Sequence, residues 1–238
     1  ATKGNFNNHI GLPLTLLSFN NTLDFGITEM GANHPGEIND LCQIAEPNYG
    51  LITNIGKAHL EGFGSFEGLK NTKKEIYDYL ENKGVIFCNN DNELLCNLLD
   101  NHKFKTYGTQ SNADYYIEFI SANPFVTVQI NQIESCIVKS KLIGSYNFEN
   151  ISAAISIGLY FKVPLIDIKS AIEDYIPDNN RSQIIRKGSS TIISDAYNAN
   201  PSSLEKAIEN IYQINAEKKV IIIGDMFELG DYAESEHK

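Results

Sequence analysis

Hydrophobic positions in the first third of the chain follow a strand–helix–strand pattern. Two short runs, residues 25–30 and 49–55, are rich in the β-branched and aromatic residues of buried strands. Between them, residues 37–45 carry apolar side chains at the i, i+3, i+4 and i+7 spacing of an amphipathic helix. The pattern predicts a βαβ unit. Because open parallel sheets bind ligands beyond the carboxyl ends of their strands, we expect Glu29 and His59 to face one site.

The pattern continues with further helices and strands. Ser65 is a predicted N-cap for a helix that carries Lys73. Residues 114–143 alternate in three β-type runs without a helical period, which predicts an antiparallel insertion at the edge of the sheet. The other predicted elements are helices at residues 12–19, 92–99, 147–159 and 165–175, and strands at residues 85–88 and 104–107.

A polar linker at residues 177–180 marks a predicted domain boundary. After it come two short strands, residues 183–186 and 191–194, a helix that begins at Pro201, and an apolar strand at residues 220–223. The expected fold class is therefore α/β: a mostly parallel ATPase-type sheet with an antiparallel edge insertion, followed by an incomplete Rossmann-like domain. The predicted domains are residues 1–179 and 180–238.

Composition narrows the functional class. The formal net charge of −11 argues against a nucleic-acid-binding protein. The four cysteines form no CxxC pair, which favours reduced thiols in a cytoplasmic protein. No apolar run approaches the ~18 residues of a membrane span. Neither end of the chain carries a clear terminal element, so we expect both ends to be truncated; we also expect a monomer.

Two strand ends carry side chains that suit a metal ion. A carboxylate at Glu29 and an imidazole at His59 suit a divalent cation, and a site with few protein ligands plus phosphate oxygens suits Mg²⁺. The alternative is that Glu29 caps a helix and His59 is a hydrogen-bonded turn residue. Asp195 also follows an apolar run, although a solvated turn explains it equally well, and Arg181 is either a phosphate clamp or a surface charge. No GxxxxGK[ST] phosphate loop occurs in the sequence.

Six stretches, spread in order over almost the whole chain, resemble the ATP-dependent Mur ligases. They are TKGNFNNHIGLPLTLL, ITEMGANHPGEI, LITNIGKAHLEGFGSFEGLKNTKKEI, GSYNFENISAA, ISDAYNANPSS and IIIGDMFELGDY. Three shorter motifs resemble sequences of one branch of this family, the branch that joins D-alanyl-D-alanine to UDP-N-acetylmuramoyl-tripeptide. They are EMGANHPGEI, AHLEGFGS and DAYNANP. The resemblance implies a central ATPase domain and a Rossmann-like C-terminal domain. It also implies a UDP-binding domain and the phosphate loop upstream of these residues. The 238 residues by themselves are therefore expected to be inactive.

The resemblance also implies roles for individual residues. Glu29 and His59 would bind Mg²⁺, and Lys73 aligns with a lysine that is carbamylated in related ligases. For the nucleotide, ATP, the implied contacts are Asn147, Asn150, Arg181 and Asp195. For the muramoyl-peptide and the dipeptide they are Asn5, Asn7, Asn8, Tyr197 and Asn198. Two departures stand out: Tyr146 replaces a frequent histidine, and no glycine precedes Arg181.

The implied reaction forms an acyl phosphate from the peptide carboxylate and ATP, which the amine of D-alanyl-D-alanine then attacks. Cations are needed because the carboxylate and the γ-phosphate repel each other. Two alternatives stay open: a nucleotide- or metal-binding module without ligase chemistry, and a sister ligase that adds a single amino acid.

Overall fold

The computed structural model describes residues 1–56, 60–99, 102–131, 135–177, 180–227, 229–230 and 233–237, with residues 60 and 61 described by their backbone alone. The main body is one six-stranded sheet whose strands lie side by side in chain order. Its first three junctions are parallel and its last two are antiparallel. The strands are β1 (Tyr49–Leu51), β2 (Val85–Asn89), β3 (Phe104–Gly108), β4 (Tyr115–Ala122), β5 (Phe125–Asn131) and β6 (Ser135–Ile143).

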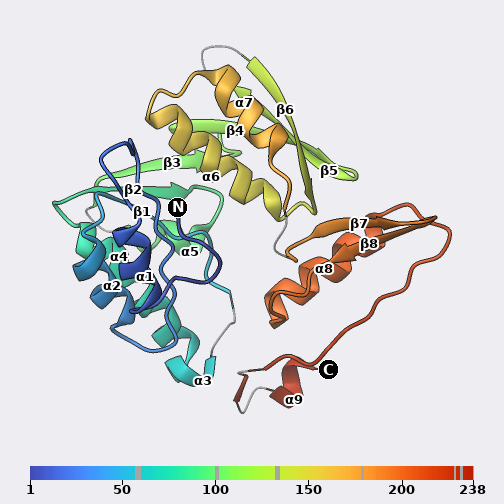
Figure 1. Cartoon of the computed structure of the whole chain (residues 1–238), viewed down its shortest axis with the longest axis horizontal. Coiled ribbons are helices and arrows are strands. Elements are labelled where there is room, and N and C mark those ends of the chain that lie inside the picture. Colours follow the sequence, from blue (N-terminus) through green and yellow to red (C-terminus); the bar gives the residue numbers. More distant parts are fainter. Residues whose placement is uncertain are drawn as a thin grey trace.

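Helices cover both faces of the parallel part of the sheet (Figure 1). Side chains alternate along β2, so Ile86 and Cys88 pack with α4 (Phe66–Leu80) and α5 (Glu93–Cys96), while Phe87 packs with α6 (Asn147–Tyr160) on the other face. α2 (Glu37–Ala45) packs on α4, and α1 (Gly11–Leu17) packs on α2. α3 (Leu60–Phe63) leads into α4.

The antiparallel strands β4–β6 are covered by α6 and α7 (Leu165–Asp174), which places a second apolar core at this end of the sheet. Burial alternates along β5 and along most of β6, as expected for strands with one covered face, whereas in β4 only Ile117 is fully buried. The α/β fold class and the antiparallel edge insertion are confirmed.

The strands beyond residue 180 form a second, separate sheet (Figure 1). β7 (Gln183–Lys187) and β8 (Ser190–Ser194) form an antiparallel hairpin, followed by α8 (Pro201–Gln213). Asn200 caps α8 as predicted: its side chain accepts from the Ser203 N–H at 2.9 Å, and Pro201 opens the helix. Residues 214–227 contain no helix or strand, and α9 (Ala233–Glu236) comes after them in the chain.

One predicted strand does not form, and another is shorter than predicted. Residues 25–30 contain no strand, and Phe25 and Ile27 are 54% and 65% exposed. The Ile27 carbonyl accepts from the Thr2 N–H at 3.0 Å, so this segment lies against the N-terminal loop instead of the sheet. The predicted strand at residues 49–55 is shortened to Tyr49–Leu51, the part that pairs with β2. The βαβ interpretation was therefore wrong in its first strand.

Residues 220–223 are irregular as well, with Val220 and Ile222 at 82% and 94% exposure. An apolar run forms a strand only where another strand hydrogen-bonds to its backbone. In the described part of the chain, no strand is paired with residues 220–223. No described helix is long and apolar enough to cross a membrane.

Candidate functional site

The charge of Glu29 acts on the amine of Lys73, although 44 positions separate the two residues in the sequence. Burial lowers the pKa of the half-buried Lys73 amine, and the negative charge of Glu29 opposes that shift. Glu29 is exposed; its Oε1 accepts from the Asn7 side-chain amide at 2.9 Å, and its N–H donates to Thr2 Oγ1 at 2.8 Å. The structure thus connects the candidate carboxylate to the candidate lysine through charge, and to Thr2 and Asn7 of the N-terminal segment through hydrogen bonds.

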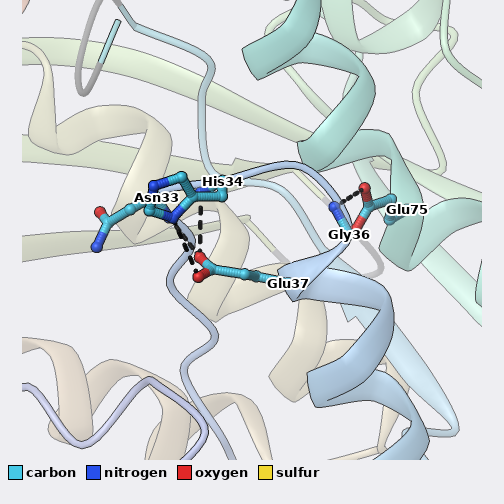
Figure 2. A network of polar contacts seen from close by, with 5 residues as sticks. All are labelled: Asn33, His34, Gly36, Glu37 and Glu75. Atoms are coloured by element: carbon cyan, nitrogen blue, oxygen red, sulfur yellow. Dashed lines mark hydrogen bonds and ion pairs between the residues drawn. The ribbon is translucent and has the colours of Figure 1, made fainter. Parts of the chain in front are cut away.

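The loop after Glu29 is held by two carboxylates (Figure 2). Oε2 of Glu37, the first residue of α2, accepts from the N–H groups of Asn33 at 2.7 Å and His34 at 3.1 Å. Glu75 on α4 accepts from the Gly36 N–H at 2.8 Å and the Asn39 N–H at 2.9 Å. The loop at residues 31–36 is therefore fixed to α2 and to the helix that carries Lys73.

The same loop contacts α3. A Cβ atom on Gly62 would lie 2.1 Å from the Asn33 carbonyl oxygen, so the two backbones approach as closely as only glycine allows. Gly62 is three residues beyond His59, which itself lies outside the described residues. The prediction that Glu29 and His59 face one site is therefore not tested.

Glu29 is the described carboxylate at which Mg²⁺ was expected. Among the described residues, no group of three or more His, Cys, Asp or Glu side chains is arranged to hold a metal ion. A single exposed carboxylate fits Mg²⁺, which keeps waters and phosphate oxygens in its shell. A charged Lys73 would repel the ion; burial favours its neutral amine, which is the form that CO₂ carbamylates.

The two asparagines of α6 contact each other. Asn147 is buried, and its amide donates to the Ile143 carbonyl at 2.7 Å; the Asn150 amide donates to Asn147 Oδ1 at 3.1 Å. Asn147 therefore fastens the first turn of α6 to the end of β6, and Asn150 is exposed on the next turn.

The residues after the linker form a second polar group. The Arg181 guanidinium lies 4.2 Å from the centre of the Tyr197 ring, a cation–π contact. Asp195 Oδ1 accepts from the Ser182 N–H at 3.1 Å. Desolvation raises the pKa of the Asp195 carboxyl, against that hydrogen bond and the charge of Arg181.

This second group contacts α6 through Tyr146. The Tyr146 hydroxyl lies in hydrogen-bonding contact with the Ser182 hydroxyl. Asn198 is exposed close to the same group in sequence. The structure therefore joins Arg181, Asp195 and Tyr197 to one another and, through Ser182, to the residue that precedes Asn147.

Asn8 and Asn5, the two remaining predicted substrate contacts of the N-terminal segment, differ in their local structure. Asn8 Oδ1 accepts from the N–H groups of Ile10 and Gly11 at 3.1 and 2.9 Å, which caps the start of α1. The backbone carbonyl of Asn5 accepts from the Asn7 N–H at 2.7 Å, and Asn5 is exposed. A separate pocket of about 340 Å³ lies between β4 and α8, and none of the predicted site residues lines it.

Comparison with known proteins now adds to this geometry. Residues 1–158 match the Mur ligase middle domain, and residues 180–238 match the Mur ligase glutamate ligase domain. The chain belongs to the Mur ligase family.

Relatives within the Mur ligase family are similar along the whole chain. UDP-N-acetylmuramoyl-tripeptide–D-alanyl-D-alanine ligase of Bacillus subtilis is 38% identical over 240 residues, covering 100% of this chain and 52% of the relative. A crystal structure of MurF from Acinetobacter baumannii has a TM-score of 0.90 at 32% identity, covering 99% of this chain and 52% of that one. MurF from Thermotoga maritima, solved in complex with ADP, has a TM-score of 0.81 at 25% identity, with 99% and 55% covered. The chain spans about half the length of the curated relatives it matches.

Sequence reasoning missed two carboxylates of this Mur ligase chain. Glu37 could have been recognised, because an acidic residue in the first turn of a helix often accepts from nearby backbone N–H groups. Glu75 carries no such signal, since its partners lie 39 and 36 residues away. Only the packing of α2 on α4 reveals it.

Proposed function

We propose that this chain acts within an ATP-dependent ligase that joins D-alanyl-D-alanine to UDP-N-acetylmuramoyl-tripeptide in peptidoglycan precursor synthesis. The observation that carries the proposal is the similarity of this chain, along its whole length and at 38% identity, to a ligase named for that reaction. The juxtaposition of Glu29 and Lys73 supports it, because a ligase that brings two anions together needs a cation site.

The metal site would consist of Glu29, His59 and Lys73, and the expected ion is Mg²⁺. When bound, the ion would neutralise charge on the phosphates and on the peptide carboxylate. Glu29 offers a carboxylate oxygen, and its hydrogen bond with Asn7 fixes the direction of that group. Lys73 would take part as a carbamate, which turns a repelling ammonium into an anionic ligand.

The nucleotide, ATP, would lie between α6 and the segment that follows the linker. Asn150 would contact the adenine, with Asn147 in the same nucleotide site, while Arg181 and Asp195 would contact the phosphates and ribose. The contact of Tyr146 with Ser182 supports this placement, since it brings the two groups to the same junction. Closure of the C-terminal domain over the nucleotide would then position the reacting groups.

The peptide substrate and the dipeptide would meet Asn5, Asn7, Asn8, Tyr197 and Asn198. Of these, Asn7 has the strongest support, because its amide already contacts Glu29. The peptide carboxylate would attack the γ-phosphorus of ATP and release ADP. The dipeptide amine would then attack the acyl carbon, lose its proton and expel phosphate.

We further propose that a middle domain ends at residue 179 and a C-terminal ligase domain begins at residue 180; the two family matches support this division. We also propose a cytoplasmic monomer. Cys42, Cys88, Cys96 and Cys136 are free thiols, as expected in a reducing compartment.

The deciding experiment measures phosphate release by the complete product of the gene that encodes this chain. ATP, Mg²⁺ and UDP-N-acetylmuramoyl-tripeptide are present, with and without D-alanyl-D-alanine. Release that requires the dipeptide supports the proposal. Equal release with single amino acids would favour a sister ligase, and ADP binding without any release would favour a binding module.

A further inference from the structure

The loop at residues 31–36 is connected to Glu29, to α3 and to the helix that carries Lys73. It follows Glu29 directly in the chain, and the Gly31 N–H donates to the carbonyl of Asn7, the residue whose side chain holds Glu29. Its Asn33 carbonyl abuts Gly62, three residues beyond His59. Its far end is bonded to Glu75, two residues beyond Lys73. A shift of this loop would therefore change the position of Glu29 relative to α4.

Glu75 holds the loop by capping α2 from another helix. Gly36 is the N-cap of α2 and has a left-handed φ of 90°, and no side chain of α2 itself caps this end. The Glu75 carboxylate accepts from the Gly36 and Asn39 N–H groups with one oxygen each. An anion at the amino end of a helix is also favoured by the helix dipole.

Lys73 and Glu75 are two positions apart on α4, so their side chains leave the helix in different directions. One lies near Glu29 and the other lies at the amino end of α2. Residues 29–36 therefore run from Glu29, on the Lys73 side of α4, to Gly36, which is bonded to Glu75 on another side of the same helix. Apolar packing of Leu41 and Cys42 on Leu69 fixes the two helices against each other.

We propose that Glu75 is a positioning residue: it fixes the amino end of α2 and the loop at residues 31–36, and through that loop it holds Glu29 in place relative to α4. Glu75 itself touches neither substrate nor metal in this scheme. The inference rests on the proposed function only in taking Glu29 and Lys73 as the metal-binding pair.

The test compares Glu75→Ala and Glu75→Gln with Glu67→Gln in the complete gene product. Glutamine keeps one acceptor oxygen and should bond one of the two N–H groups. Glu67 is the matched control, because it lies on the same helix, is 63% exposed, and pairs at 2.7 Å with Lys70 of that helix. The probe is Mn²⁺, whose binding to the ADP complex is followed by electron paramagnetic resonance; kcat and KM are measured in parallel.

Misplacement of a reacting group by about 1 Å can cost ~100-fold in rate. We therefore expect Glu75→Ala to weaken Mn²⁺ binding about tenfold and to lower kcat between about tenfold and 100-fold, with KM for the dipeptide unchanged. Glu75→Gln should lie between Glu75→Ala and the wild type, and Glu67→Gln should match the wild type.

Unchanged Mn²⁺ affinity in Glu75→Ala would overturn the inference. If that variant does not fold, Glu75→Gln decides by the same criterion. A wild type that binds Mn²⁺ without ligase activity would refute the proposed function, while the metal measurement still decides the role of Glu75. A wild type that binds no Mn²⁺ would overturn the inference, because no site would remain for Glu75 to position.

Discussion

The Tyr146 hydroxyl contacts the Ser182 hydroxyl and so connects the residue before α6 to the start of the C-terminal segment. Ser182 is almost fully buried, and its N–H donates to Asp195. Burial raises the pKa of Tyr146, so this side chain stays a neutral phenol at physiological pH and can donate its proton. The junction between the two matched regions therefore contains a Tyr–Ser–Asp chain.

Removing the phenol should loosen this junction. We expect Tyr146→Phe to lower the free energy of unfolding by about 0.5–1.5 kcal/mol, the usual net value of one hydrogen bond. Urea titration measures it. Tyr212→Phe is the control, because Tyr212 is 73% exposed on α8. Equal urea midpoints for Tyr146→Phe and the wild type would show that the contact contributes nothing.

Lys73 should react with carbon dioxide. The lowered pKa of its amine increases the neutral fraction, which attacks CO₂ to form a carbamate and releases one proton. In ¹³C-bicarbonate, NMR should show one carbamate signal that disappears in Lys73→Arg, whereas Lys70→Arg should keep it. We expect Lys73→Arg to lower kcat by about 100-fold or more, in the range seen when a catalytic charge is removed. A signal that survives the substitution would assign the carbamate to another amine.

The Glu37 carboxylate should make stability depend on pH. The Asn33 N–H, above all, holds its pKa below the ordinary value of 4.5. Its stabilising effect is therefore complete above pH 4.5 and is lost as the pH falls through the lower pKa of the folded state. Glu37→Gln should be less stable than the wild type at pH 7, and this difference should vanish in acid. A difference in thermal midpoint that stays constant with pH would contradict this assignment.

Gly62 should tolerate no side chain. An added Cβ would lie 2.1 Å from the Asn33 carbonyl oxygen, whereas Gly224 has nothing within 4 Å of that position. We expect Gly62→Ala to cost about 1–3 kcal/mol, the usual range for overpacking, and Gly224→Ala to be neutral. Thermal unfolding checks both variants. Wild-type stability in Gly62→Ala would mean that the loop at residues 31–36 moves away at little cost.

Local signals predicted much of the fold. Ser65 caps α4 by accepting from the Gly68 N–H at 3.0 Å, and Asn200 caps α8, because capping depends on residues within one turn. The antiparallel strands were predictable from their alternation. The failures at residues 25–30 and 220–223 have one cause: an apolar run shows that burial is favourable, but not which neighbour supplies it.

The sequence was enough to propose individual residues of the candidate site, but not the hydrogen bonds that hold them in place. Glu29 and Lys73 were both expected, and the structure places the charge of one beside the amine of the other. The bonds of Glu75 to α2 depend on how two helices pack, which no pattern along the chain encodes. The roles assigned to Asn150, Arg181 and Asp195 remain proposals.

The exposed run at residues 220–223 has a practical consequence for any preparation of these 238 residues. Val220, Ile221, Ile222 and Ile223 are β-branched, uncharged and accessible to solvent. Such a segment offers unpaired backbone groups and apolar side chains to a second copy, which is the usual starting point of aggregation. We expect the purified chain to lose solubility as its concentration rises, and Ile222→Lys to restore solubility.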